Sequence, residues 1–176
     1  VKLANPNDPT VLSPGVPFPQ GGNPEAGGAM QPLGARLYVV DSVRGRVQVI
    51  NSNTFQPLGV LPGVSSPRGL GIGGTFLYVS NFDQDTLSRV GIQPAQVSTF
   101  HQVVSTTSVG PGPTAVSVQN GNEDVVILNS LANSISFVDV PTFNERAQLP
   151  VGQGPREIAV SARWTGMGTT FAYQAY

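Results

Sequence analysis

The residue best suited to acid–base or metal chemistry in this chain is His101, the only histidine. One histidine cannot build the usual multi-ligand metal centre, and there is no cysteine to assist it. A Ser-His-Asp site would also have to use His101, but the Gly-x-Ser-x-Gly elbow is absent. We predict a strand over residues 97–104, in which His101 is a surface or packing residue. We therefore expect no catalytic constellation, no metal site and no cofactor.

The carboxylates and amides of the chain stand mostly at turns. Asp83-Gln84-Asp85 has the ligand alternation of a calcium loop, but the required glycine and the distant glutamate are missing. We interpret it as a solvated hairpin turn. Asp41, Asn81 and Asn129 each end a short apolar run, and we expect them to accept hydrogen bonds from nearby backbone amides.

Two groups of side chains are candidates for binding. Arg68 and Arg156 directly follow prolines, and Thr114 has the matching place in a third stretch. Guanidinium groups hold anions and carboxylates well, although a structural arginine bridging neighbouring sheets fits the same pattern. The second group is aromatic and gathers near the C-terminus, where it forms either core or an interface. The predicted ligand- or partner-binding residues are Arg68, Thr114, Arg156, Trp164, Tyr173 and Tyr176.

The composition restricts the fold and the partners. The chain of 176 residues is long enough for one sizeable core, and 21 glycines with 16 prolines favour short strands joined by tight turns. No sustained helical period is present. A net charge of −1 argues against nucleic acid, and no apolar run approaches the roughly twenty residues that span a bilayer. The absence of cysteine fits either the cytoplasm or export without disulfide chemistry.

Residues 1–35 differ from the rest, because they contain seven of the sixteen prolines and two glycine pairs. Such frequent prolines and glycines predict an extended, Pro/Gly-rich N-terminal arm in polyproline or irregular conformation. A disordered linker is the simpler interpretation. An ordered arm would have to lie against its own domain or against a partner.

From residue 36 onward the chain repeats a unit of about four short strands. The turn prolines recur as Pro67, Pro113 and Pro155, and the strand-ending polar residues recur as Asp41, Asn81 and Asn129. Both series have a spacing of roughly 40–50 residues, which is typical of propeller blades. Such blades stack because one small sheet cannot bury both faces alone. We therefore predict an all-β fold for residues 36–176.

Several stretches carry a resemblance to a known family. Leu77-Tyr78-Val79-Ser80-Asn81, Phe137-Val138-Asp139 and the run from Val151 to Arg156 resemble the YVTN-type β-propeller repeat, over about residues 36–176. The resemblance implies that the strand after each turn proline is innermost, at residues 68–73, 113–119 and 156–161. Arg68, Thr114 and Arg156 would then face one mouth of the central channel.

The repeats supply three outer strands over residues 37–61, two full blades and a final inner pair, whereas closed propellers have at least four blades. We expect an incomplete piece of a longer propeller or, alternatively, an open arc whose edges are covered by the arm or another protein.

The expected function is a non-catalytic scaffold or interaction subunit of a larger periplasmic or extracellular assembly, bound to other protein subunits and reaching a membrane complex only through them. The alternative is a fragment of a propeller enzyme or electron-transfer protein that binds a small ligand at the channel mouth.

Overall fold

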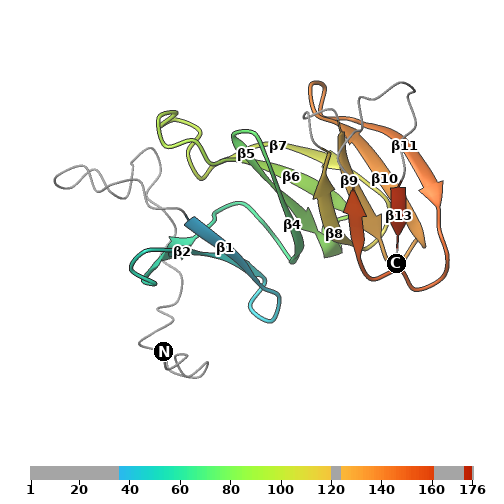
Figure 1. The fold of residues 1–176 in the computed structure, drawn as a ribbon, viewed down its shortest axis with the longest axis horizontal. Helices are drawn as coiled ribbons and strands as arrows, with labels where there is room; N and C mark the ends of the chain where they lie inside the picture. The colour runs from blue at the N-terminus through green and yellow to red at the C-terminus, as the bar shows by residue number, and fades with distance from the viewer. Residues whose placement is uncertain (1–35, 120–123, 161–172, 176) are drawn as a thin grey trace.

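The strands of the protein lie in four antiparallel sheets, seen in a computed structural model that describes residues 36–119, 124–160 and 173–175 (Figure 1). Sheet A contains β1 (Arg36–Asp41), β2 (Arg46–Asn51) and β3 (Pro57–Val60). Sheet B contains β4 (Pro67–Gly73), β5 (Phe76–Asn81), β6 (Thr86–Gly91) and β7 (Val103–Ser108). Sheet C contains β8 (Pro113–Val118), β9 (Asp124–Asn129), β10 (Ser134–Asp139) and β11 (Glu145–Pro150), and sheet D contains β12 (Ile158–Val160) and β13 (Tyr173–Ala175).

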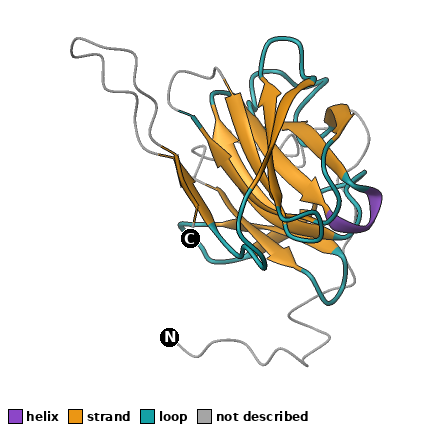
Figure 2. Ribbon diagram, turned by 90° about the vertical axis from the view of Figure 1, so that its right-hand side faces the viewer, coloured by secondary structure: helices purple, strands orange, loops and turns teal. Residues whose placement is uncertain are grey.

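Within each sheet, strands that are consecutive in sequence are neighbours, and the sheets stand beside one another in an open row (Figure 1). Figure 2 views this row from its end. The single helical element among the described residues is the short 3-10 turn η1 (Phe82–Gln84). The predicted all-β, propeller-type fold is confirmed, with two complete four-stranded blades and an arc that is open. The predicted arm, residues 1–35, lies outside the described residues.

The core lies between the sheets. Val125 and Ile127 of β9 pack toward sheet B with Tyr78, whereas Val126 and Leu128 of the same strand pack in a second cluster toward sheet D. Alternate residues of a strand point to opposite faces, so a continuous apolar run is needed where both faces are buried. This explains why residues 125–128 are all apolar.

The inner strands approach one another closely. A Cβ added to Gly69 of β4 would lie 2.5 Å from the Thr114 carbonyl oxygen of β8, and one on Gly71 would lie 2.9 Å from Val116 Cγ1. Small residues therefore let β8 lie directly against β4. The predicted inner strands over 68–73 and 113–119 match β4 and β8, while the third begins later than predicted, at Ile158.

Asparagines at the ends of β5 and β9 tie strands together through hydroxyl groups. Asn81 Nδ2 donates to Thr86 Oγ1 (3.0 Å) and Ser88 Oγ (2.8 Å). Asn129 Nδ2 likewise donates to Ser134 Oγ (3.1 Å) and Ser136 Oγ (2.7 Å). The expectation of bonds from nearby backbone amides holds for Asp41, which accepts from Arg44 N at 3.1 Å, and for Asn81, whose Oδ1 accepts from Ser65 N at 3.3 Å. It is wrong for Asn129, because that residue is fully buried among serines of the next strand.

Loops also connect neighbouring sheets. Asp85 follows η1 with φ 52°, and its Oδ1 accepts a hydrogen bond from Gly112 N of the turn before β8 at 2.8 Å. Asn133 repeats the arrangement one blade later, with φ 50° and an Oδ1 that accepts from Gly154 N at 2.8 Å. The interpretation of residues 83–85 as a merely solvated turn is therefore wrong for Asp85, which links sheet B to the loop that starts sheet C.

Candidate functional site

Each of the three predicted channel-side residues directly follows a turn proline, at or just before the start of an inner strand. Arg68 is exposed, and its guanidinium lies 5.1 Å from the centre of the Phe82 ring. Thr114 is half-buried and donates from Oγ1 to the Leu128 carbonyl at 3.3 Å. Arg156 is exposed just before β12. The fold thus places Arg68 and Thr114 on adjacent strands, and their role in binding stays a prediction.

The predicted aromatic group is described only in part. Tyr173 is the first residue of β13, and its backbone pairs with Val160 of β12. Trp164 and Tyr176 lie outside the described residues. A binding role for this group therefore also stays a prediction.

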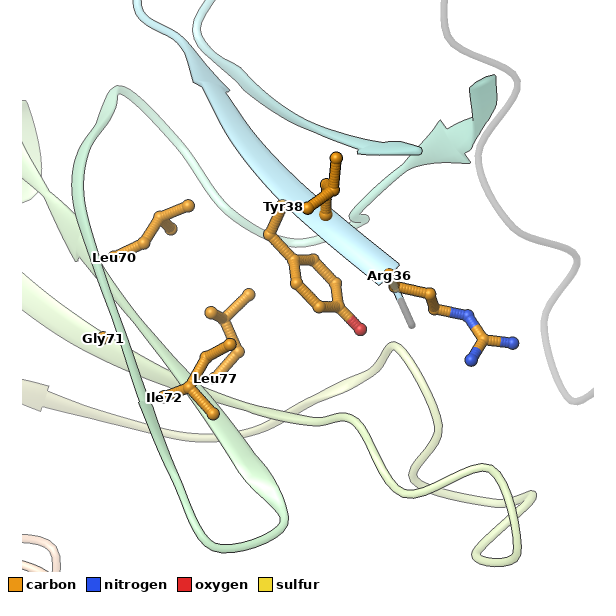
Figure 3. Close-up of a pocket in the computed structure, with 7 residues that line it drawn as sticks. Arg36, Tyr38, Leu70, Gly71, Ile72 and Leu77 are labelled. Carbon is orange, nitrogen blue, oxygen red and sulfur yellow. The ribbon is translucent and has the colours of Figure 1, made fainter. Parts of the chain in front are cut away.

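A pocket of about 400 Å³ opens beside β1, at a place that sequence reasoning did not identify (Figure 3). Arg36, Leu37 and Tyr38 line one side of it, and Leu70 and Ile72 of β4 line the other. The Tyr38 ring extends from β1 toward the strands of sheet B, as Figure 3 shows. The Tyr38 hydroxyl forms a hydrogen bond with His101 Nε2, at 3.0 Å.

His101 is buried beside this pocket, in a turn before β7 and not in a strand. Its side chain is 1% exposed, its φ is 56°, and its ring stacks on Phe100 with centroids 3.9 Å apart. Phe100 N donates to Gln96 O at 2.9 Å within the turn, and His101 N donates to the Gly91 carbonyl at 2.7 Å. This turn replaces the predicted strand. Of the two predicted alternatives, a surface or a packing histidine, the structure shows a packing histidine, and the predicted placement in a strand is wrong.

Burial controls the protonation states of His101 and Tyr38. Burial, assisted by the positive charge of Arg36, lowers the pKa of His101 from 6.5 to about 4. Burial raises the pKa of Tyr38 to about 12, partly offset by the same arginine. At pH 7 both groups are uncharged. A histidine with a pKa near 4 is a poor general base at neutral pH, so the pair is suited to holding sheet A against sheet B.

The described residues contain no cluster of three or more histidine, cysteine or carboxylate side chains placed to bind a metal ion. In the same part of the chain, no helix has the length and apolar character needed to cross a membrane.

Comparison with known proteins identifies the fold. No family model matches the sequence, and neither does any curated protein. In structure, the chain is similar to Kuenenia stuttgartiensis hydrazine synthase, with a TM-score of 0.64 and 21% identity over 72% of this chain and 36% of that one. It is also similar to the dihydro-heme d1 dehydrogenase NirN, with a TM-score of 0.57 and 16% identity over 80% of this chain and 34% of that one.

A third similar structure is a functionally unknown protein from Desulfotomaculum acetoxidans DSM 771, with a TM-score of 0.56 and 15% identity over 66% of this chain and 38% of that one. The chain therefore spans little more than a third of the length of these structures. At such identities the similarity establishes architecture and not activity. Together with the row of four-stranded sheets, it shows that this chain has the architecture of part of a β-propeller.

Proposed function

We propose that the chain is a non-catalytic interaction segment of a larger propeller-type assembly, built from YVTN-type repeats and located in the periplasm or outside the cell. The observation that carries this proposal is the outward face of sheet A. Leu37 and Val39 on this face are each 46% exposed, whereas Leu77 and Val79, at the same places in β5, are 0% exposed.

The repeat indicates what covers that face. Leu77 and Val79 are buried in a cluster with Val47 and Val49 of sheet A, the sheet that precedes theirs. Val125 of β9 is buried in the same way against sheet B. A four-stranded sheet of the same type, presented by a partner subunit, is therefore the surface that fits Leu37 and Val39.

The experiment measures the mass of the protein from its source, first under native and then under denaturing conditions. The proposal expects a native complex that separates into a chain of 18.4 kDa on denaturation. Leu37→Lys should release the partner, because it places a charge in the covered face. Val43→Lys is the matched control, since Val43 is 93% exposed at a hairpin tip. A native mass no larger than that of the single chain, or equal loss of the partner in both variants, contradicts the proposal.

A second candidate function is a segment of a longer propeller enzyme. Two of the similar structures are a hydrazine synthase and a dihydro-heme d1 dehydrogenase, and this chain covers 36% and 34% of them. In this case Arg68, Thr114 and Arg156 contribute to a ligand site at the channel mouth. A denatured mass well above 18.4 kDa favours this candidate. Anion binding is then measured in the Arg68→Ala, Arg156→Ala double variant, and its loss would support a ligand site at these residues.

A further inference from the structure

In the described part of the chain, sheet A lacks one strand of the repeat. Sheets B and C have four strands in the orders β4-β5-β6-β7 and β8-β9-β10-β11, whereas sheet A has β1-β2-β3. Because β1 corresponds to β5 and β9, the strand that is lacking is the inner one. Among the described residues β1 pairs only with β2, so one of its edges is open to a further strand.

The pocket beside β1 lies where that inner strand would run. It lies between β1 and the β4 residues Leu70 and Ile72 (Figure 3). Ile72 is 58% exposed, whereas Val118, at the same place in β8, is half-buried against the glycine face of β4. A strand placed in the pocket would cover Ile72 as β4 covers Val118.

The neighbouring inner strands define the sequence that fits. Each begins with proline, and the second and fourth residues after it are small: Gly69 and Gly71 in β4, Ala115 and Ser117 in β8. Small residues are required there because the next inner strand contacts them, as the 2.5 Å approach of Thr114 O to a Cβ on Gly69 shows.

The residue before the proline is also constrained. Ser66, Gly112 and Gly154 all precede a turn proline, and all have positive φ, at 47°, 66° and 67°. Glycine adopts this conformation readily, and asparagine is among the few other residues that do so often.

One stretch of the chain meets each of these requirements. Asn23 precedes Pro24, and the second and fourth residues after that proline are Ala26 and Gly28. We propose that residues 24–30 add to the free edge of β1 as the inner strand of sheet A and fill the pocket. The proposal concerns the edge of β1 and not its outward face, so it stands whether or not a partner covers Leu37 and Val39.

The register follows from the two complete sheets. The turn proline pairs with the strand-ending asparagine in both, as Pro67 with Asn81 and Pro113 with Asn129. The fifth residue after the proline pairs with the second residue of the next strand, as Ile72 with Leu77 and Val118 with Val125. In sheet A this register places Pro24 opposite Asp41 and Ala29 opposite Leu37.

A cysteine pair tests the register directly, because the chain contains no other cysteine. Ala29→Cys with Leu37→Cys places two thiols on directly opposed residues, within the Cα separation that a disulfide accepts. Ala29→Cys with Val40→Cys is the mismatched control, since Val40 is three residues away and on the opposite face. After mild oxidation of the full chain, we expect an intrachain disulfide in most molecules of the first variant and few of the second.

The same cross-link experiment can overturn the proposal. An absent disulfide in the matched pair, or equal yields in both variants, rules out this strand. A disulfide that forms only between two chains assigns the pocket to a second copy and equally overturns the intrachain strand. Mass spectrometry and non-reducing gels distinguish these results without reference to any partner.

Adjacent glycines give an independent test. Gly28 corresponds to Gly71 and faces Leu70 and Ile72 in the proposed strand, so Gly28→Val should lower the melting temperature by roughly 3–10 °C through overpacking. Gly27 corresponds to Leu70 and Val116, which carry large side chains, so Gly27→Val should leave the melting temperature unchanged or raise it. Equal effects of the two substitutions overturn the proposal.

Discussion

Sheets A and B carry the same Leu-Tyr-Val stretch at the same place, and the structure gives the two copies different surroundings. Leu77 is 0% exposed and Leu37 is 46% exposed. The Tyr38 hydroxyl meets His101 Nε2, whereas the buried Tyr78 hydroxyl has no hydrogen-bond partner among the described residues. The Asp85 side chain accepts a hydrogen bond from the loop that starts the next sheet. The matching residue in sheet A is Gly45, which has no side chain to accept such a bond.

The burial and the hydrogen bonds of equivalent residues in the repeat therefore depend on which sheet lies next to them. The joint between sheets B and C is held by a loop-to-loop bond from Asp85 and by Arg89, whose Nη1 donates to the Val140 carbonyl at 3.0 Å. The joint between sheets A and B instead has a buried tyrosine–histidine contact. Four comparisons test how each sheet depends on its neighbour, in order of decreasing effect.

The paired leucines should give the largest difference. Leu77→Ala removes a fully buried side chain, and we expect it to lower the free energy of unfolding by about 2–5 kcal/mol. Leu37→Ala should cost roughly 1 kcal/mol or less, because half of that side chain is already exposed in the isolated chain. Urea unfolding of both variants measures the difference. Equal losses would mean that the face of sheet A is covered in solution.

Acid should weaken the joint between sheets A and B. The pKa of His101 is about 4 in the folded chain and near 6.5 when unfolded, so between these values only the unfolded chain binds the proton. Stability should therefore fall by about 2–3 kcal/mol as the pH drops from 6.5 to 4. The carboxyl groups with lowered pKa, Asp41 and Asp139, lose their contribution only below about pH 3.8.

His101→Gln is the control for this pH effect, because glutamine keeps a hydrogen-bonding group near Tyr38 and does not titrate. Urea midpoints measured between pH 6.5 and 4 should be nearly constant in this variant. A variant that retains the wild-type pH slope would assign the acid sensitivity to another group.

Asp85→Ala should remove the loop bond that joins sheet B to the turn before β8. A hydrogen bond from a carboxylate to a backbone amide contributes more than a neutral one, so we expect a loss of about 1–2 kcal/mol. Asn133→Ala removes the equivalent neutral bond to Gly154 and should cost about 1 kcal/mol. Denaturant unfolding ranks the two, and a larger effect at Asn133 would contradict the ranking.

The paired tyrosines should give the smallest and most discriminating result. Tyr38→Phe deletes the hydrogen bond to His101 and should cost about 1 kcal/mol. Tyr78→Phe deletes a buried hydroxyl that lacks a partner among the described residues, so it should be neutral or stabilising. Thermal unfolding of the two variants checks the signs. A loss on Tyr78→Phe would reveal a polar partner for this hydroxyl.

The architecture was predictable because turn prolines and strand-ending residues recur along the chain. Pro67 and Pro113 begin inner strands, as the repeat indicates. The position of β7 was not predictable from apolar residues, because this strand reads Val-Val-Ser-Thr-Thr-Ser and the preceding apolar residues form turns. The His101 contact could not be predicted either, since Tyr38 is 63 residues away and lies in another sheet.

The buried asparagines have a consequence for how the chain avoids misfolding. Residues 125–128 are apolar on both faces of β9, so sliding the strand by one residue would exchange one apolar contact for another. Asn129 removes that degeneracy, because its Nδ2 donates to Ser134 and Ser136 in only one alignment and would otherwise be a buried donor without an acceptor. Asn81 does the same for β5 with Thr86 and Ser88. Sheets B and C therefore each contain a buried asparagine that fixes the alignment of their central strands and disfavours mispaired hairpins.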